Sequence, residues 1–576
     1  MEKLANHWLP KSTITCIQQN IGQEDIIPFL QFVAVVHDMG KLTPIFQSKI
    51  SQQSSFLKEK IEKKRFYIPD QSTFLEPNAT PHAFAGEAIL RLLGVNESVA
   101  CIVGAHHGKT IPDYQDVLDI LECYEENFYT EEGQNSPEGD KWQELWHEWL
   151  QFALDLCGYA SVDALPVLDV TTQLLLSGLL VMADWMASNE DYAPLLMLDD
   201  CGETLEYWQR TDDIWQKISL TQSWKPANRP LEKEDFEKIF GFPPNEVQKQ
   251  MIEAVEEATQ SGLYILEAPM GQGKTEAALA ATEILASRWE CGGLFFGLPT
   301  QATANGIFPR LKQWGEKQSE QAQLSIRLAH GMAMLQQGYR EIFHGKASQE
   351  LDAQGGLLVH EWFEGRKQAL LASFVVGTVD QLLMAGLRQK HVMLRHLGLA
   401  GKVVVIDECH AYDVYMSTYL ERVLYWLGVY QVPVILLSAT LPSKRRAELV
   451  LAYHGNRPFQ RETQGWKEST AYPLLTYTQG DELCQYSIST EMEKKNIAIE
   501  FATQQEICTI LPDKMSQGGC AGIVVNSVAT AQSIAQQIQD TLPDFEVLLV
   551  HARFTVADRQ CAEQLLLSRL GKNSTP

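Results

Sequence analysis

The 576-residue sequence lacks paired cysteines and has little positive charge. Its eleven Cys are scattered without a C-x-x-C pair or a regular spacing, so neither a disulfide framework nor a structural zinc is indicated. Lys and Arg number 47 against 73 Asp and Glu, which gives a formal net charge of −26. That charge argues against bulk attraction to nucleic acid, although an acidic protein can still line one channel with Lys and Arg.

Long hydrophobic runs and targeting segments are lacking as well. The most apolar stretch, Leu174 to Ala187, is interrupted by Asp184, and the first residues do not show the basic-then-apolar pattern of a signal peptide. We therefore expect a cytoplasmic, monomeric protein with no membrane partner. A chain of this length is too long for one core and implies roughly three or four domains.

A phosphate-binding loop is the strongest local signal. An apolar run, Leu263 to Leu266, is stopped by Ala-Pro-Met-Gly-Gln-Gly-Lys-Thr, and helical spacing follows from Glu276. Strand, loop and helix in this order predict backbone N–H groups that surround phosphate oxygens. The predicted ATP site uses Gly271, Gln272 and Gly273 for the loop, Lys274 for the β/γ-phosphates and Thr275 for Mg²⁺. Ala268 replaces the first Gly of the usual pattern, as in the helicase variety of the loop; a Gly-rich turn is the alternative.

Four further segments flank this loop at helicase spacing. Gln248 precedes it at a distance that suits adenine recognition, and Asp407 and Glu408 end an apolar run, as expected for a Mg²⁺ ligand and a residue that orients the attacking water. Polar turns after two other runs predict contacts with a nucleic-acid backbone through Thr300, Gln301, Thr378 and Gln381. Any one segment could be an ordinary core strand with a polar end, but their order favours an ATP-driven enzyme.

The N-terminal third carries imidazoles and carboxylates next to apolar segments. They are His37, Asp38, His82, His106, His107 and Asp184, with Lys41 one turn after His37. By itself His37-Asp38 is a weak signal and is more typical of a capped helix end with a surface His than of a metal site. Six such groups are expensive to bury unless they bind something, and the set suits a transition-metal pair that activates water for phosphodiester cleavage.

The ordered set resembles the HD phosphohydrolase superfamily. Over about residues 1 to 215 it is similar to the nuclease domain of the type I CRISPR-associated nuclease-helicase, and residues 240 to 445, with Asp-Glu-Cys-His at 407 to 410, resemble the first lobe of a superfamily 2 helicase. The resemblance implies an antiviral enzyme that degrades single-stranded DNA with ATP after recruitment by an RNA-guided surveillance complex. It also implies one metal at His37, Asp38 and Asp184, a second at His82, His106 and His107 bridged by Asp38, and Lys41 beside the scissile phosphate.

We expect a multidomain protein with an all-α HD domain followed by α/β RecA-like helicase lobes. The predicted boundaries are residues 1–215 for the HD domain, 216–244 for a linker, 245–455 for the first lobe and 470–576 for part of a second lobe. Strands are predicted at 521–526 and 547–554 in the second lobe.

The chain departs from the family at both ends. We find no His-x-x-Asp pair on a helix before His37, and no final helicase motifs after the second-lobe segments. His7 is considered as a substitute ligand; a solvated or aromatic-packed His is the alternative. We therefore expect an incomplete copy that binds nearer one metal ion than two, nicks weakly and hydrolyses ATP slowly. A non-catalytic fragment that binds DNA or the surveillance complex, and an HD phosphohydrolase fused to an ATPase, are the alternative functions.

Overall fold

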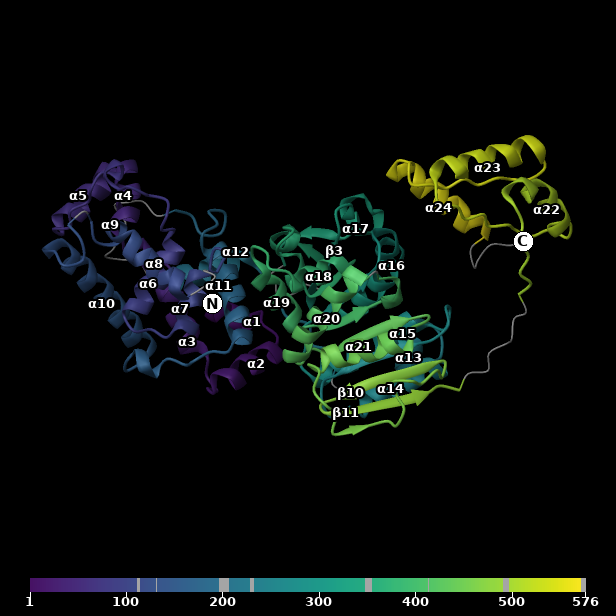
Figure 1. Ribbon diagram of the computed structural model, residues 1–576, viewed down its shortest axis with the longest axis horizontal. Coiled ribbons are helices and arrows are strands. Elements are labelled where there is room, and N and C mark those ends of the chain that lie inside the picture. Colours follow the sequence, from purple (N-terminus) through teal and green to yellow (C-terminus); the bar gives the residue numbers. More distant parts are fainter. Residues whose placement is uncertain are drawn as a thin grey trace. The chain divides into compact units, whose positions relative to one another are not determined.

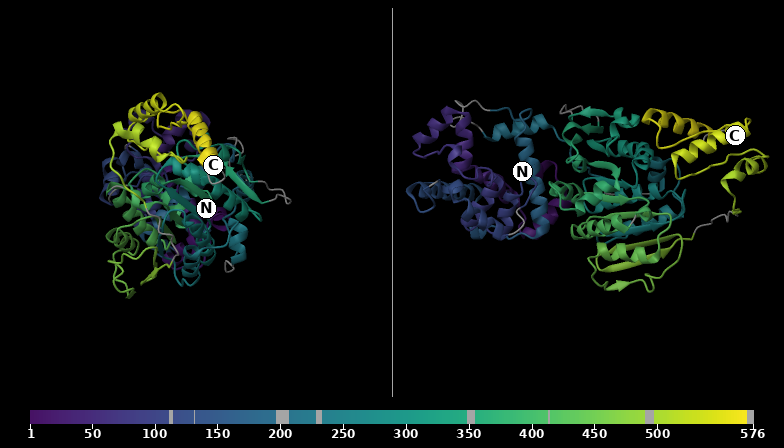
Figure 2. Two further views of the ribbon diagram at one scale, coloured as in Figure 1. Left: turned by 90° about the vertical axis from the view of Figure 1, so that its right-hand side faces the viewer. Right: turned by 45° about the horizontal axis from the view of Figure 1, so that its top comes forward.

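The computed structural model describes residues 1–110, 114–130, 132–195, 207–227, 233–347, 355–412, 414–489 and 497–570 (Figure 1). The chain divides into two compact units, Met1–Thr490 and Glu491–Pro576. The first unit contains a helical domain and a sheet domain, which lie beside each other in the right-hand view of Figure 2.

The N-terminal domain is all helical, which confirms the predicted fold class. Its α-helices are α1 (Glu2–His7), α2 (Lys11–Ile21), α3 (Ile27–Val36), α4 (Pro44–Gln53), α5 (Ser55–Lys63), α6 (His82–Leu92), α7 (Glu97–Gly104), α8 (Tyr114–Cys123), α9 (Glu125–Tyr129), α10 (Pro137–Cys157), α11 (Val170–Ala187) and α12 (Tyr207–Ile218). A 3-10 turn, η1 (Met39–Lys41), follows α3.

Helix α11 lies in the core of this domain. The side chain of Asp169 accepts a hydrogen bond from the Thr172 N–H, at 2.8 Å, and so caps the start of the helix. By length and composition alone α11 could cross a membrane. It packs against α7 and against α19 (Val392–Ala400) of the sheet domain, and its residues from Leu175 to Met182 are all buried. This packing explains its apolar composition as that of a core helix.

The sheet domain is built on a largely parallel sheet. In the part of the chain that the structure describes, the strands are β1 (Leu263–Glu267), β2 (Leu294–Leu298), β3 (Gln323–Ala329), β4 (Phe343–Gly345), β5 (Gly356–His360), β6 (Phe374–Thr378), β7 (Val403–Ile406), β8 (Val434–Ser438), β9 (Arg461–Glu462), β10 (Leu474–Gln479) and β11 (Glu482–Ser487), in the order β4-β5-β3-β6-β2-β7-β8-β1-β10-β11-β9. The four strands that carry the predicted motifs, β6, β2, β7 and β1, lie together with β8 in the order β6-β2-β7-β8-β1, and neighbouring strands in this group pair in parallel. Their carboxyl ends therefore meet along one edge.

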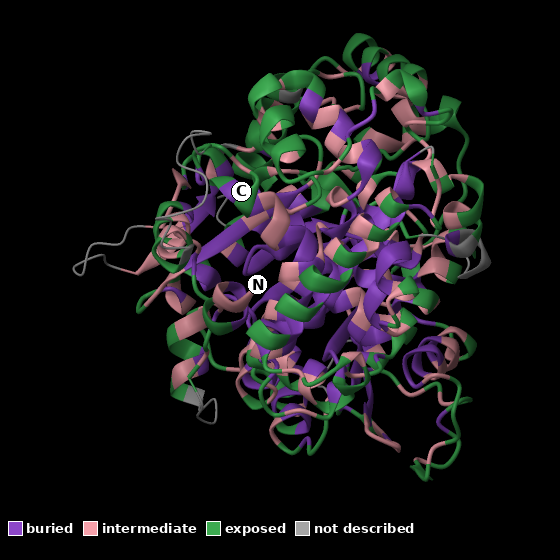
Figure 3. Cartoon of the chain, turned by 90° about the vertical axis from the view of Figure 1, so that its left-hand side faces the viewer, coloured by how far each residue is buried: buried purple, intermediate pink, exposed green. Residues whose placement is uncertain are grey.

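Helices cover both faces of the sheet. They are α13 (Lys233–Phe240), α14 (Glu246–Glu256), α15 (Lys274–Arg288), α16 (Gln301–Gln318), α17 (Gln337–Arg340), α18 (Val379–Leu383), α19, α20 (Val414–Val429) and α21 (Ser443–Tyr453). Alternate strand residues enter two cores: Tyr264 and Val405 pack with α14 and α15, whereas Ile265 and Val404 share a core with the helical domain. The buried strands lie between layers of helices, and the outer surfaces of these helices are exposed (Figure 3). One continuous apolar core thus joins the helical domain to one face of the sheet.

Two predicted boundaries differ from the structure. Trp224, in the predicted 216–244 linker, is 2% exposed and its ring packs against Trp314 and Phe374, so this part of the segment belongs to the sheet domain; residues 228–232 lie outside the described residues. The predicted second lobe began at 470, but β10 pairs antiparallel with β1 and β11 with β10. Because β10 is buried along nearly its whole length beside β1, these strands extend the first sheet instead of starting a second one.

The regular structure in the described part of the second unit is helical. It contains α22 (Ile507–Lys514), α23 (Val528–Thr541) and α24 (Val556–Leu570). The strands predicted at 521–526 and 547–554 do not form, and Val524 is 96% exposed. A parallel strand needs hydrogen-bonded neighbours and helices on both faces, and the described residues of this unit supply no strand as a neighbour. The second lobe is only partly covered by the chain.

Candidate metal centre and nucleotide site

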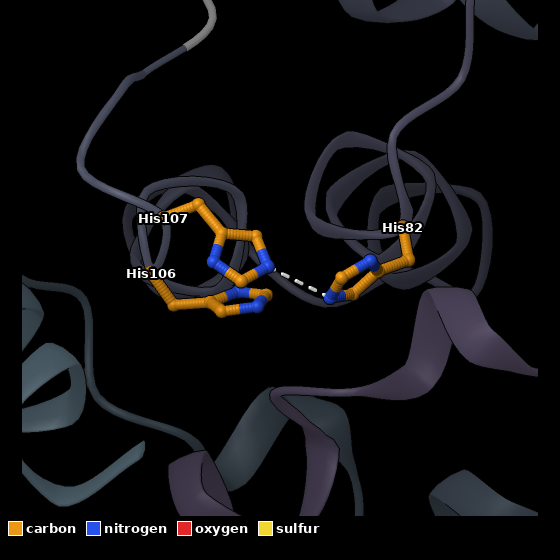
Figure 4. A group of neighbouring side chains, drawn as sticks. All are labelled: His82, His106 and His107. Carbon is orange, nitrogen blue, oxygen red and sulfur yellow. Dashed lines mark hydrogen bonds between the residues drawn. The ribbon is translucent and has the colours of Figure 1, made fainter. Parts of the chain in front are cut away.

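The six predicted metal ligands come from four separate segments and converge in the helical domain. His37 ends α3, Asp38 precedes η1, and His82 is the first residue of α6. His106 and His107 follow α7, and Asp184 lies on α11. The ligand nitrogens of His82, His106 and His107 all lie within 4.8 Å of one another, and their rings face a common space (Figure 4). The structure therefore brings the three imidazoles into metal-binding proximity.

The Asp38 carboxylate connects the two predicted ligand groups. Its Oδ2 lies 3.3 Å from Nε2 of His37 and its Oδ1 lies 3.5 Å from Nε2 of His82. Nε2 of His37 is also 3.8 Å from Oδ1 of Asp184, and Nε2 atoms of His82 and His107 are 2.8 Å apart. Asp38 thus has one oxygen toward each group, the arrangement that a bridging ligand requires.

Main-chain carbonyls fix the orientation of two ligand rings. Nδ1 of His37 lies 2.7 Å from the carbonyl oxygen of Ala34, and Nδ1 of His106 lies 2.6 Å from that of Val103. A ring whose Nδ1–H donates to a carbonyl keeps Nε2 free of a proton, so Nε2 is the available ligand atom. These contacts are the outer support that metal-binding histidines usually have.

The electrostatics of the site suit cation binding. Burial lowers the pKa of His82 and of His106 to about 4, and it also lowers the pKa of His107. Neutral imidazole is the form that binds metals. Burial opposes ionisation of Asp38, but His37 and Lys41 outweigh it and hold the pKa of this carboxyl well below its usual range. The donor set therefore fits a divalent transition metal.

A close contact between two backbone segments places His82 beside Asp38. A Cβ on Gly40 would come 1.9 Å from the carbonyl oxygen of His82 and 2.6 Å from the nitrogen of Gly86. Only glycine leaves room for η1 to lie against the start of α6 at this distance. The Gly after His-Asp-Met thus determines how near the two ligand segments lie.

Lys41 and His7 have different positions relative to the centre. The ammonium of Lys41 lies 2.6 Å from Oδ2 of Asp38, and its side chain is 41% exposed. His7 packs against Trp215, with ring centroids 5.6 Å apart and the rings tilted by 36°, and it does not belong to the ligand group. The aromatic-packed alternative for His7 is the one that the structure shows. Among the described residues, the His37 group accordingly holds one imidazole and the His82 group holds three.

The phosphate loop lies at the carboxyl end of β1. Gly271 and Gly273 have φ values of 80° and 70°, and Lys274 and Thr275 begin α15. The Lys274 ammonium donates to the carbonyl oxygens of Ala268 and Pro269, at 2.7 and 3.3 Å. Burial lowers the pKa of Lys274, while the charges of Glu408 and Asp407 act in the opposite direction. The lysine and the acidic pair therefore share one site.

The Gln248 side chain is hydrogen-bonded to the main chain of the phosphate loop. Its amide nitrogen donates to the carbonyl oxygen of Gly273 at 3.2 Å, and its amide oxygen accepts from the N–H of Asn245 at 2.9 Å. The Asn245 side chain in turn donates to the carbonyl oxygen of Gln272 at 3.0 Å. Gln248 is fully buried, so its amide positions the loop in this structure; adenine recognition by Gln248 stays a prediction.

The acidic pair is connected to the end of β8. Burial, with the neighbouring charge of Glu408, raises the pKa of Asp407 to about 6. Glu408 has a left-handed φ of 53° and lies 3.3 Å from Nε2 of His410. Nδ1 of His410 is 3.1 Å from the hydroxyl of Ser438, which donates to the carbonyl oxygen of Thr440 at 2.8 Å. A hydrogen-bonded path thus runs from the hydrolysis residues to residues 438–440, at the end of β8.

The predicted nucleic-acid residues lie on the neighbouring strand ends. The Thr300 side chain caps α16 after β2, and Gln301 is the exposed first residue of α16. Thr378 ends β6 and directly precedes α18, without a side-chain capping hydrogen bond. The Gln381 main-chain and side-chain oxygens both accept from the Arg395 guanidinium, at 2.9 and 3.3 Å. Because β6 and β2 adjoin β7, this row of residues continues the edge that holds the nucleotide site.

One buried residue below the phosphate loop was not found from the sequence. Arg446 on α21 is 2% exposed and its Nη1 lies 2.8 Å from Oε2 of Glu267, the last residue of β1. Its neighbour Arg445 is also positively charged but pairs with the partly exposed Glu421. Helical spacing places Arg446 on the buried face of α21, which is the only signal in the sequence that distinguishes the two arginines.

Three protein families match successive parts of the chain. The family "Cas3, HD domain" matches residues 1–193, "DEAD/DEAH box helicase" matches residues 245–449, and "CRISPR-associated nuclease/helicase Cas3, C-terminal" matches residues 517–576. These matches coincide with the helical domain, with the sheet domain and with the second unit.

Whole-chain comparisons agree with the family matches. A CRISPR-associated nuclease/helicase Cas3 from Streptococcus thermophilus is 39% identical over 587 residues, covering 99% of this chain and 63% of the relative. A crystal structure of T. fusca Cas3-ATP has a TM-score of 0.74 at 27% identity, covering 99% of this chain and 64% of that one. A chain in a CRISPR RNA-guided surveillance complex, pre-nicking, has a TM-score of 0.66 at 26% identity, covering 98% and 61%. The chain spans less than two thirds of the length of these relatives.

Proposed function

Since the chain belongs to the Cas3 nuclease-helicase family of type I CRISPR systems, we propose that it cleaves single-stranded DNA at the helical-domain centre. We further propose that ATP hydrolysis at the sheet edge moves it along that strand. The observation that carries the proposal is the convergence of His82, His106 and His107 with Asp38. A cytoplasmic location and a monomeric state stay predictions of the sequence.

The residues of the centre have distinct proposed roles. The four histidines, Asp38 and Asp184 would hold divalent transition metal, which when bound would activate water for attack on the phosphodiester and favour loss of the departing oxygen. Asp38 bridges the two ligand groups, because one of its oxygens faces His37 and the other faces His82. Lys41, partly exposed and next to Asp38, binds a non-bridging oxygen of the DNA phosphate and positions it over the centre.

At the sheet edge, Lys274 and Thr275 bind the phosphates and Mg²⁺, and Asp407 and Glu408 complete the hydrolytic site. Similarity to the T. fusca structure with ATP supports this assignment. Contacts through Thr300, Gln301, Thr378 and Gln381 hold the DNA backbone without reading its sequence. Similarity to a chain in a pre-nicking surveillance complex supports recruitment by an RNA-guided complex, which delivers the displaced strand.

The test is cleavage of closed circular single-stranded DNA during titration with Co²⁺ or Ni²⁺. Cleavage should depend on the metal, stop with a chelator and be lost in Asp38→Ala. Because the His37 group holds one imidazole among the described residues, cleavage should be weak and should need more metal than the first ion requires for binding. Lys274→Ala is the matched control: it should lose ATP binding and keep the nick. Cleavage that persists in Asp38→Ala would refute the proposal.

A further inference from the structure

The sheet domain contacts the turn that carries two of the metal ligands. His391 lies immediately before α19, the helix that packs along α11. Its N–H donates to the carbonyl oxygen of Gly108 at 2.9 Å, and Gly108 directly follows His106 and His107. A main-chain hydrogen bond thus connects the two domains one residue from the metal centre.

The imidazole ring of His391 covers this turn. The residue is 6% exposed, and its ring centroid lies 5.0 Å from that of Trp185, which follows the ligand Asp184. A Cβ on Gly108 would come 2.2 Å from Nδ1 of His391, so the ring lies directly on the Gly108 backbone. One ring therefore contacts both segments that present ligands from α7 and α11.

The conformation of His391 shows that this contact is specified by the surrounding structure. Its φ of 63° is in the left-handed region, which residues other than glycine seldom adopt unless their neighbours require it. Nδ1 of His391 is buried and has no hydrogen-bond partner among the described residues. The ring therefore acts through its shape and not through a polar contact of its own.

The same segment leads back to the predicted DNA contacts. Thr378 ends β6, α18 follows, and the 3-10 turn η8 (Met384–Gly386) leads to His391. The side-chain nitrogen of Gln389 donates to the carbonyl oxygen of Met384 at 2.6 Å and fixes the intervening loop. A short, well-connected stretch of chain thus runs from the helicase edge to the ligand turn.

We propose that His391 is a positioning residue of the nuclease centre: its ring, supplied by the sheet domain, holds the His106–His107 turn so that both imidazoles face His82. This rests on the proposed metal centre and extends it, because a residue of the helicase part then sets the affinity of the nuclease part for its metal.

The experiment measures Co²⁺ binding to the full chain by calorimetry and by the visible absorption of the bound ion. His391→Gly removes the ring and tolerates the left-handed backbone, and should weaken Co²⁺ affinity about 10-fold to 100-fold, as loss of outer-shell support does. His391→Phe restores a ring of similar shape and should restore affinity and spectrum. Arg388→Ala, an exposed change on the same loop, should alter neither. ATP binding should be equal in all four proteins.

The outcomes separate this proposal from the proposed function. If His391→Gly binds Co²⁺ like the unmodified chain while His107→Ala does not bind it, the metal centre stands and the positioning role is wrong. A loss that His391→Phe fails to restore, or a loss of ATP binding together with Co²⁺ binding, also overturns the positioning role, because general packing would then explain the defect. If the unmodified chain binds no Co²⁺, both the centre and the positioning role fail.

Discussion

Replacing Arg446 by Met would remove the cation from a buried ion pair directly below the phosphate loop. Nη1 of Arg446 lies 2.8 Å from Oε2 of Glu267, and the two side chains are 2% and 5% exposed. Nη2 also donates to the carbonyl oxygens of Trp466 and Ser469. Glu267 precedes Ala268, whose N–H donates to the carbonyl oxygen of Ser438 at 3.1 Å. The Glu267–Arg446 ion pair therefore connects α21, β1 and the phosphate loop.

The expected loss of stability is large because the remaining carboxylate would be buried and unpaired. Removing one partner of a buried ion pair costs about 3 to 5 kcal/mol. The double variant Glu267→Gln/Arg446→Met leaves no buried charge, so it should be more stable than Arg446→Met alone, with a coupling of roughly 1 to 3 kcal/mol. The control is Arg445→Met, whose partly exposed pair with Glu421 should be worth about 1 kcal/mol or less.

The defect should also depend on pH. Burial raises the pKa of Glu267, and Arg446 opposes that rise; without Arg446 the folded-state pKa increases further above the unfolded value of about 4.3. A raised folded pKa means that stability falls as pH rises above the unfolded value. Arg446→Met should therefore be less destabilised at pH 5 than at pH 8. Urea denaturation of the three variants, the single variant Glu267→Gln and the unmodified chain measures this, and equal stability of Arg446→Met and the unmodified chain at pH 8 would refute the reasoning.

Three other predictions concern different parts of the molecule. Gly40→Ala should separate η1 from α6, because its Cβ would lie 1.9 Å from the His82 carbonyl oxygen, and calorimetry should show weakened Co²⁺ binding with ATP binding unchanged. Lys402 is buried, and burial lowers its pKa to about 7, whereas the unfolded chain keeps this proton up to about pH 10.4. Between pH 7 and pH 10.4 the free energy of unfolding should therefore rise by about 5 kcal/mol relative to that of Lys402→Met. A difference between the two proteins that does not depend on pH would contradict this. Binding of single-stranded DNA, followed by fluorescence anisotropy, should weaken steeply and equally for different sequences as salt increases; an affinity that depends on sequence and not on salt would exclude backbone contacts.

The parallel part of the sheet could be predicted because its strands have a local signal. Each is a short, fully apolar run that stops at a polar turn, and the run from Val403 to Ile406 followed by Asp407 is typical. Strands β10 and β11 could not be assigned to this sheet, since their antiparallel pairing with β1 depends on contacts between distant segments. For residues 521–526 the local pattern indicates a strand, but strand formation also needs neighbours, which local pattern does not supply.

The site was predictable to the level of residue type and order. The histidines and aspartates stand out because ionisable groups rarely sit beside apolar helix faces without a ligand. Their distances depend on packing such as that of Gly40 on α6, which has no local signature. The hydrogen bond between His391 and Gly108 joins residues almost three hundred positions apart in the sequence. The hydrogen bond from the Gln248 side chain to Gly273 also depends on tertiary structure, and so does the position of the Gln248 amide beside Asn245.

The central claim is that the helical domain binds a catalytic transition metal, and metal content tests it most directly. The chain is loaded with Co²⁺ or Ni²⁺, passed through a desalting column and analysed by mass spectrometry, beside His82→Ala and the surface change Arg388→Ala. We predict nearer one ion than two per chain in the unmodified protein and in Arg388→Ala, because only the His82 group has three imidazoles among the described residues, and none in His82→Ala. Retention of the same metal content in His82→Ala, or no metal in the unmodified chain, would contradict the account.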